Sequence, residues 1–320
     1  MKRIPYKIRM TGLKVPAGTI PLRALSEVSE ALLATAERAV RLAMEGTSKK
    51  AGRRPAWLDA ATEFTFIGTS EGSTVIDFDA PQLGAVIPEK ISQQHLFTDQ
   101  PAENDTAVSV LLEAVSDAVG QDLESDRFDD GVLEGLEPLS SLLDKYADSV
   151  DIESSDRREE NLSFDSEKLQ TLKQIKTEIP EPAAVVLAGT LNVIEHREKA
   201  FTLLMKDNQQ ITGEVDANYV NPERMRDFWG EKVTVKGLAH FRPSGKIRFL
   251  ELRLIRSFEP GDAVFEKEPS RASANQAVKE TRRKTAPEES PLKKIWGQWP
   301  GEESIDEILL ALENSHETSQ

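Results

Sequence analysis

Few residues of this chain have types and spacing that could support catalysis. Gly68-Thr69-Ser70-Glu71-Gly72 matches the G-x-S-x-G pattern, in which a serine nucleophile occupies a sharp turn between a strand and a helix. Residues 74–79 alternate apolar and polar side chains, so they predict a returning strand and a hairpin turn instead. The four histidines are scattered and supply no evident base for the serine. We therefore expect no catalytic residues and a non-enzymatic protein.

One acidic segment partly matches a calcium-binding loop. Asp126, Asp130 and Glu137 stand at ligand positions of such a loop, but Phe128 occupies the third position, where an oxygen ligand is needed. An acidic loop between helices is the better interpretation. The sequence also lacks a phosphate-binding glycine loop, a dinucleotide fingerprint and an H-E-x-x-H zinc motif. We expect neither a metal nor a cofactor.

Basic side chains between residues 183 and 257 could bind phosphate groups. Oligonucleotide/oligosaccharide-binding (OB) barrels hold single strands with cations and stacking aromatics on two strands and their neighbouring loops. The candidate cations are Arg197, Lys199, Arg242, Lys246 and Arg248. Aromatic residues are scarce there, and Phe201 alternates with Leu203 and Met205 as a core residue would. Single-stranded nucleic-acid binding is therefore the alternative function, beside a purely structural or protein-docking barrel.

The C-terminal segment has the pattern of a short docking helix. Ser304 and Glu307 form a capping box, and the aliphatic residues after Ser304 recur at i, i+3, i+4 and i+7. A helix of about ten residues is marginal alone, so it requires a surface to pack on. That surface could be the chain's own barrel or a partner protein. The predicted partner-binding residues are Trp296, Trp299, Ile305, Ile308, Leu309 and Leu312.

The run from Trp299 to Ser304, W-P-G-E-E-S, followed by an acidic helix ending at Glu313, resembles the C-terminal tail of small bacterial antitoxin-like proteins. These proteins neighbour PIN-domain ribonuclease toxins. The resemblance covers about twenty-five residues, with Glu302 where the family usually has Asp. It implies a toxin as the protein partner, with both tryptophans as anchors and with Lys293 or Lys294 directed toward the acidic metal site of the toxin. A protein-interaction or antitoxin-like regulator is thus the expected function.

Charge and composition limit the other possibilities. The net charge of −15 is concentrated between Asp99 and Lys168, where 21 acidic and 5 basic residues give −16, whereas residues 1–55 carry 12 basic and 4 acidic residues, or +8. The overall acidity disfavours non-specific DNA binding. No apolar run approaches the ~20 residues that span a bilayer, and there is no cysteine. We expect a cytoplasmic protein without membrane contact.

The elements that must position these residues divide into five regions. Residues 1–88 are predicted as an N-terminal α+β domain, with a strand over 6–13, a helix from Pro21 to Gly46 and a hairpin over 63–79. In that helix Leu22, Leu25, Val28 and Leu32 recur at helical spacing. Residues 89–180 are an acidic helical region and linker, with helices expected over 106–119, 133–146 and 166–176 and a solvated loop over 151–160.

Residues 181–258 give five strand-like runs, with a short helix after Pro222 between the third and the fourth, which is the order of an OB-like β-barrel. Residues 259–290 are a polar flexible linker, and residues 291–320 are the docking tail. The expected fold class is α+β: a small N-terminal α/β module, an acidic helical region, a five-stranded OB-like β-barrel and a flexible C-terminal tail.

Overall fold

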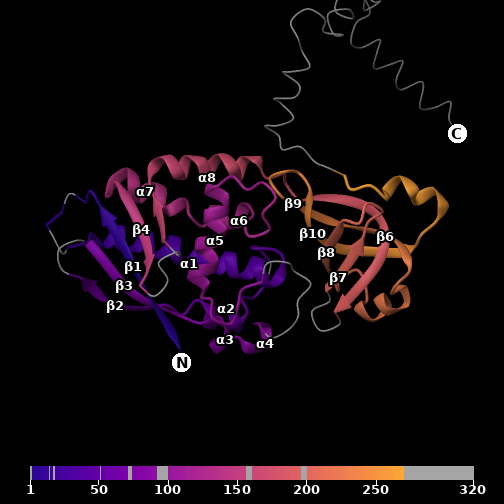
Figure 1. The fold of residues 1–320 in the computed structure, drawn as a ribbon, viewed down its shortest axis with the longest axis horizontal. Helices are drawn as coiled ribbons and strands as arrows, with labels where there is room; N and C mark the ends of the chain where they lie inside the picture. Colours follow the sequence, from indigo (N-terminus) through magenta and orange to yellow (C-terminus); the bar gives the residue numbers. More distant parts are fainter. Residues whose placement is uncertain are drawn as a thin grey trace, which may run out of the picture. The chain divides into compact units, whose positions relative to one another are not determined.

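The computed structural model describes residues 2–13, 15–16, 19–50, 52–70, 74–91, 100–155, 161–195 and 200–269. Five antiparallel strands form its first sheet, in the order β2-β3-β1-β4-β5 (Figure 1). The strands are β1 (Arg3–Thr11), β2 (Thr65–Ser70), β3 (Thr74–Pro81), β4 (Ser149–Ser154) and β5 (Asn161–Phe164). Side chains of β1 alternate between buried and partly exposed, so one face of the sheet supports the core.

Helices cover the buried face of this sheet. The longest is α1 (Leu22–Glu45), followed in sequence by α2 (Ala56–Ala61), α3 (Leu83–Val86), α4 (Pro88–Ile91), α5 (Ala107–Val119), α6 (Asp130–Glu134), α7 (Glu137–Lys145) and α8 (Ser166–Glu178). Thr106 caps α5 by accepting a hydrogen bond from the backbone of Ser109, and Asp165 caps α8 in the same way from Lys168. Both helices therefore begin where the sequence predicts them.

The two N-terminal regions expected from the sequence share one core. β4 and β5 come from the acidic region and extend the sheet beside β1. Buried residues from Ile4 to Ile175 form one continuous hydrophobic cluster. The prediction of a solvated loop over residues 151–160 is wrong for residues 151–154, which belong to β4. In β4, Val150 and Ile152 alternate with polar residues and their side chains are buried.

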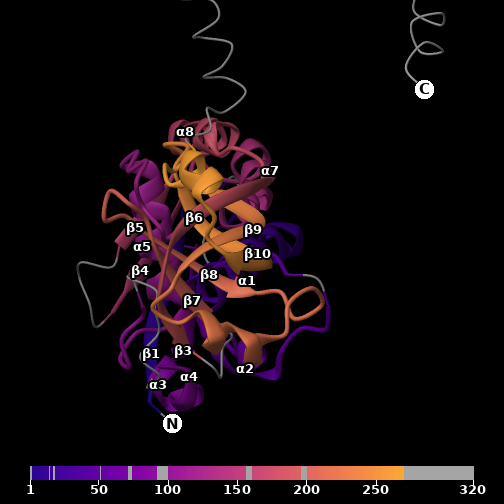
Figure 2. The same cartoon turned by 90° about the vertical axis from the view of Figure 1, so that its right-hand side faces the viewer.

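The second sheet is a closed five-stranded barrel with its own core (Figures 1 and 2). Its strands are β6 (Ala183–Glu195), β7 (Ala200–Leu204), β8 (Gln210–Val215), β9 (Lys232–Phe241) and β10 (Ile247–Ser257), in the order β10-β8-β7-β6-β9. All neighbours pair antiparallel except β8 and β10, whose parallel contact closes the barrel. Two 3₁₀ helices, η1 (Pro222–Phe228) and η2 (Pro260–Phe265), flank β9 and β10 in sequence.

A mixed α+β fold containing a closed five-stranded barrel is thus confirmed. The register of β10 with β9 shifts between Ile247 and Phe249 and again between Leu252 and Leu254, so β10 is irregular at two places. Within the described ranges, no helix combines the length and apolar character that a membrane crossing requires. The flexible linker predicted over residues 259–290 is wrong at its start, because residues 260–265 form η2 and bury the side chain of Asp262. The rest of that linker from residue 270 onward, and the predicted docking tail, lie outside the described residues.

Candidate functional site

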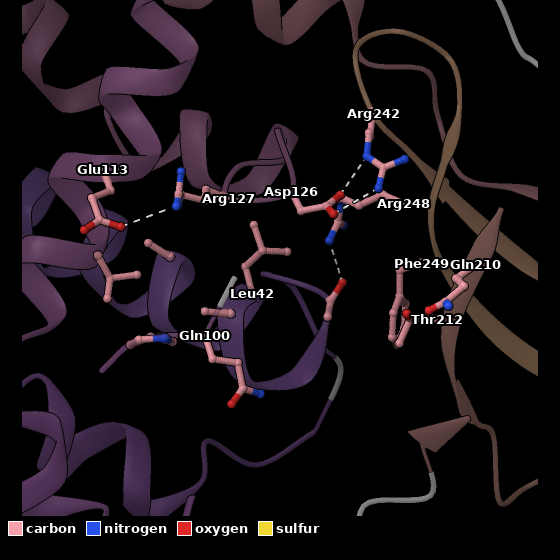
Figure 3. A pocket seen from close by; sticks show the side chains of 15 residues that line it. Leu42, Gln100, Glu113, Asp126, Arg127, Gln210, Thr212, Arg242, Arg248 and Phe249 are labelled. Carbon is pink, nitrogen blue, oxygen red and sulfur yellow. Dashed lines mark hydrogen bonds and ion pairs between the residues drawn. The ribbon is translucent and has the colours of Figure 1, made fainter. Parts of the chain in front are cut away.

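A cleft of about 310 Å³ lies where the barrel meets α1, α5 and the loop before α6 (Figure 3). Leu42 and Gln100 line it on one side, and Gln210, Thr212 and Phe249 of the barrel line it on the other. Arg127, Arg242 and Arg248 also border it, together with Glu113 and Asp126. The cleft is therefore rich in charge, and its chemistry depends on how those charges pair.

Asp126 binds one edge of the Arg242 guanidinium through both of its carboxylate oxygens. Arg242 donates from Nε and Nη2 to the two carboxylate oxygens at 2.7 and 2.9 Å (Figure 3). Burial opposes the charge of Arg242, but the hydrogen bonds to Asp126, together with the negative charges of Asp126, Glu124 and Glu268, outweigh it and raise the pKa of the guanidinium. Such a two-point contact fixes the relative orientation of its partners more strictly than a single ion pair does.

The contact continues along two segments, which we call the barrel loop (residues 242–246) and the acidic loop (residues 122–130). Lys246 lies 3.1 Å from Glu124, and the backbone amide of Ser244 donates to the carbonyl of Leu123 at 3.2 Å. Outside these loops, Lys50 contacts Glu214 of β8 at 2.8 Å. The barrel is thus joined to the sheet-and-helix part largely by opposite charges.

Arg248 lies deepest in this contact. Its side chain is only 4% exposed; Nη1 donates to the carbonyl of Gly46 at 2.8 Å, and Nη2 lies 3.5 Å from Asp129. Nε and Nη2 have no hydrogen-bond acceptor within the part of the chain described. Desolvation therefore lowers the pKa of Arg248, although Asp129 opposes this. Asp129 is itself held by the backbone amides of Ser48 and Val132.

The other acidic and basic side chains around the cleft are also paired. Arg127 contacts Asp117 at 3.0 Å. It also contacts Glu113 at 3.5 Å (Figure 3). Asp130 binds Lys49, and Glu137 binds Lys176. These two carboxylates of the partial calcium loop therefore contact different lysines and do not converge on one point. Within the described ranges, no cluster of three acidic or histidine side chains could hold a metal ion.

The residues predicted from the sequence are placed as follows. Arg242, Lys246 and Arg248 come together at this contact, each beside a carboxylate. Arg197 and Lys199 lie outside the described residues, as do Trp296, Trp299, Ile305, Ile308, Leu309 and Leu312. Ser70 ends β2, which pairs antiparallel with β3, so the G-x-S-x-G segment joins two strands rather than a strand and a helix.

A second surface was not predicted. An apolar groove of about 250 Å³ runs between α1 and the edge of the sheet and is lined by Ile8, Leu25, Ser29, Leu32, Leu33, Phe64, Phe66, Ile76 and Phe78. Phe66, which lines the groove, is 60% exposed; Ile67 follows it in β2 and is 59% exposed, and Leu22, about one turn before Leu25 on α1, is 83% exposed. We call the side chains of Leu22, Ser26, Ser29, Leu33, Phe66 and Ile67 the uncharged face. The signal available in the sequence was an edge strand, residues 65–70, without charge or proline.

Comparison with known proteins identifies no relative: no family model, no curated protein and no solved structure matches the chain.

Proposed function

We propose that this chain acts by binding other protein chains and that the uncharged face is a docking surface. The observation that carries this proposal is an apolar groove with no charged lining residue, in a chain of which 30% of the residues are charged. Contiguous exposed apolar surface of this kind marks interaction sites in soluble proteins. Edge strands in stable monomers are protected by charge, proline or a bulge; β2 lacks charge and proline and has one register shift, between Phe66 and Gly68.

The apolar term supplies a large part of the free energy that specific binding needs. Leu22, Leu33, Phe66 and Ile67 are all exposed. Covering a fully exposed side chain of this kind gains about 1.5–3 kcal/mol; because these four are 42–83% exposed, together they give roughly 4–7 kcal/mol before the costs of association are subtracted. Micromolar affinity needs about 8 kcal/mol net, so the partner must bury comparable apolar surface of its own to reach it.

The C-terminal segment is proposed as a second binding element. Its tryptophans and the aliphatic stripe Ile305, Ile308, Leu309 and Leu312 support an antitoxin-like regulator whose partner is a PIN-domain ribonuclease. This proposal is supported by the sequence resemblance and is independent of the uncharged face.

The two elements are tested by comparing variants of the full chain. Complexes purified from the native host are identified by mass spectrometry for the unaltered chain, for Phe66→Lys/Leu33→Lys and for Ile308→Asp/Leu309→Asp. The first pair should remove partners of the uncharged face, and the second should remove a ribonuclease. A partner set unchanged by both pairs would refute the protein-binding function.

Single-stranded nucleic-acid binding is the second candidate, favoured by the strand order of the barrel. The parallel β8–β10 contact, the antiparallel remainder and a short helix between β8 and β9 support an OB-like fold. The pairing of Arg242, Lys246 and Arg248 with carboxylates weakens this candidate, because paired cations have less charge to offer to phosphate.

This candidate is tested with a fluorescent twelve-nucleotide single strand at low salt. Binding should fall steeply with added salt and should weaken in Lys246→Glu, which alters an exposed pair. Absence of any change in anisotropy at 20 mM salt would exclude it, since phosphate attraction is strongest there.

A further inference from the structure

The exposed side of α1 has a symmetric arrangement of residues. Leu22, Ser26, Ser29 and Leu33 follow one another at spacings of four, three and four, and helical periodicity places all four on one stripe. The spacing reads the same from either end of the helix. Leucines stand at the two ends of the stripe, and small serines stand at its centre.

We infer that the uncharged face binds a second copy of this chain, with the two α1 helices packed antiparallel about a two-fold axis between Ser26 and Ser29. This inference rests on the proposed docking function and names its partner. An antiparallel pair centred there places Leu22 against Leu33 of the second copy, and the reverse contact forms by symmetry. The serines at the crossing allow the two helix backbones to approach closely, because they have little volume.

The same two-fold arrangement brings opposite charges beside the stripe together. Arg23 and Glu30 are exposed and flank the stripe on one side, opposite the side on which Leu25 faces the groove. In an antiparallel pair of helices, residues on the same flank face each other, so Arg23 of one copy approaches Glu30 of the other. In a parallel pair each flank faces the opposite flank of the partner helix, so Arg23 and Glu30 of the two copies would not meet. The sequence of α1 therefore favours the antiparallel arrangement.

The edge strand extends the contact. Leu33 and Phe66 line the same groove, so Leu22 of the second copy, packed on Leu33, also lies beside Phe66. Phe66 of one copy and Leu22 of the other, both exposed in the single chain, then bury each other. Each copy then contributes the same apolar side chains, as an isologous interface requires.

Because each copy is strongly negative, we expect the dimer to become more stable as the salt concentration rises. Two copies that each carry −15 repel one another, while the surface that joins them is mostly uncharged. Added salt screens the repulsion, with a Debye length of about 8 Å at physiological ionic strength. The self-association should therefore tighten as salt rises, whereas nucleic-acid binding would weaken.

The experiment is sedimentation equilibrium of the full chain from 1 to 200 μM at 50 and 300 mM salt. We expect a dimer whose dissociation constant is at least threefold lower at 300 mM than at 50 mM salt. Leu33→Glu should weaken it 10-fold or more. Leu254→Glu is the matched control, because Leu254 is a similarly exposed leucine on the barrel, and it should leave the dimer unchanged.

A charge exchange tests the arrangement itself. Arg23→Glu should weaken the dimer severalfold, and Arg23→Glu/Glu30→Arg should restore it. A chain that remains monomeric at 200 μM, or a dimer indifferent to Leu33→Glu and to the exchange, overturns the inference. A monomeric chain that binds a different protein through Phe66 and Leu33 would overturn it as well, but would leave the proposed docking function intact.

Discussion

Arg248 and Lys246 lie two residues apart on the barrel and both face carboxylates, yet their burial differs widely. The Arg248 side chain is 4% exposed, whereas that of Lys246 is 45% exposed. Removing one partner of a buried charge pair leaves the other uncompensated, which costs several kcal/mol, while exposed pairs contribute about 0–1 kcal/mol. The two substitutions should therefore have very different effects.

We expect Arg248→Met to lower the free energy of unfolding by about 3 kcal/mol and Lys246→Met to lower it by less than about 1 kcal/mol. The lower end of the usual range applies to Arg248, because Asp129 keeps its hydrogen bonds to Ser48 and Val132. Urea denaturation followed by circular dichroism measures both values. Equal losses in the two variants would show that burial does not decide the effect.

Asp262 gives a prediction about pH. Arg256, the Glu259 amide and Thr234 donate hydrogen bonds to its carboxylate and lower its pKa from 3.8 to about 2. A carboxylate with a lowered pKa in the folded state stabilises the protein above its unfolded pKa, and this stabilisation is lost as pH falls toward 2.

We therefore expect Asp262→Asn to melt at a lower temperature than the unaltered chain at pH 7 and the difference to shrink between pH 4 and pH 2. Differential scanning fluorimetry across that range measures it. A difference independent of pH would mean that the hydrogen-bond geometry, and not the charge of Asp262, stabilises η2 against β9.

The sequence predicted the kind of residue at the cleft but not its partner. Arg242 and Lys246 were recognisable as loop cations of a barrel, whereas Asp126 and Glu124 are more than a hundred positions away in the chain. Leu22 was assigned to the apolar stripe of its helix with Val28 and Leu32, which are buried, but it is exposed. Helical periodicity shows which residues share a face of the helix, but it does not show which of them the rest of the protein buries.

At the scale of elements, Gly46 ends α1 for two separate reasons, its backbone conformation and its closeness to the barrel. Gly46 has a φ of +73° in the left-handed region, and a Cβ added there would lie 2.4 Å from the ring of Phe249. Gly230 has a φ of +76° and no atom within 4 Å of such a Cβ. Comparing the two glycines separates backbone strain from the contact with the barrel.

We expect Gly230→Ala to cost about 1 kcal/mol of stability from the backbone alone. Gly46→Ala should cost roughly 2–4 kcal/mol, because the Phe249 ring must also move. Thermal unfolding of the two variants measures the difference. Equal costs would mean that the barrel moves away from α1 without penalty.

Strands were predictable where turns and alternation agreed and were missed where charge obscured the pattern. The five barrel strands have clear apolar alternation and recognisable ends, and all five were found. β4 was missed because Asp151 and Glu153 stand beside other acidic residues, although Val150 and Ile152 carry the period of two. Its pairing with β1 is a long-range contact that local pattern does not encode.

At the scale of the whole described molecule, two hydrophobic cores are joined by polar contacts. The core of the first sheet and that of the barrel are separate clusters. Asp126 and Arg242 therefore couple the stability of the barrel to that of the helices. Heat should unfold the unaltered chain in one cooperative transition.

We expect Asp126→Ala/Arg242→Ala to separate this transition into two, since the double substitution removes the two-point contact without leaving either charge unpaired. Differential scanning calorimetry shows whether one or two peaks occur. The matched control is Arg127→Ala/Asp117→Ala, a pair within the helical part, which should keep one peak. A single peak in both variants would assign the coupling to apolar contacts such as Phe249 with Gly46.

The position of β1 at the centre of the first sheet bears on synthesis at the ribosome. β1 is complete at Thr11, β3 becomes available at Pro81 and β4 only after Ser149. At typical elongation rates, the interval from Thr11 to Ser149, about 140 residues, lasts roughly 7–30 seconds. During that time the backbone groups on the β4 side of β1 have no strand to pair with, and unpaired strand edges of this kind make partly folded chains prone to aggregate.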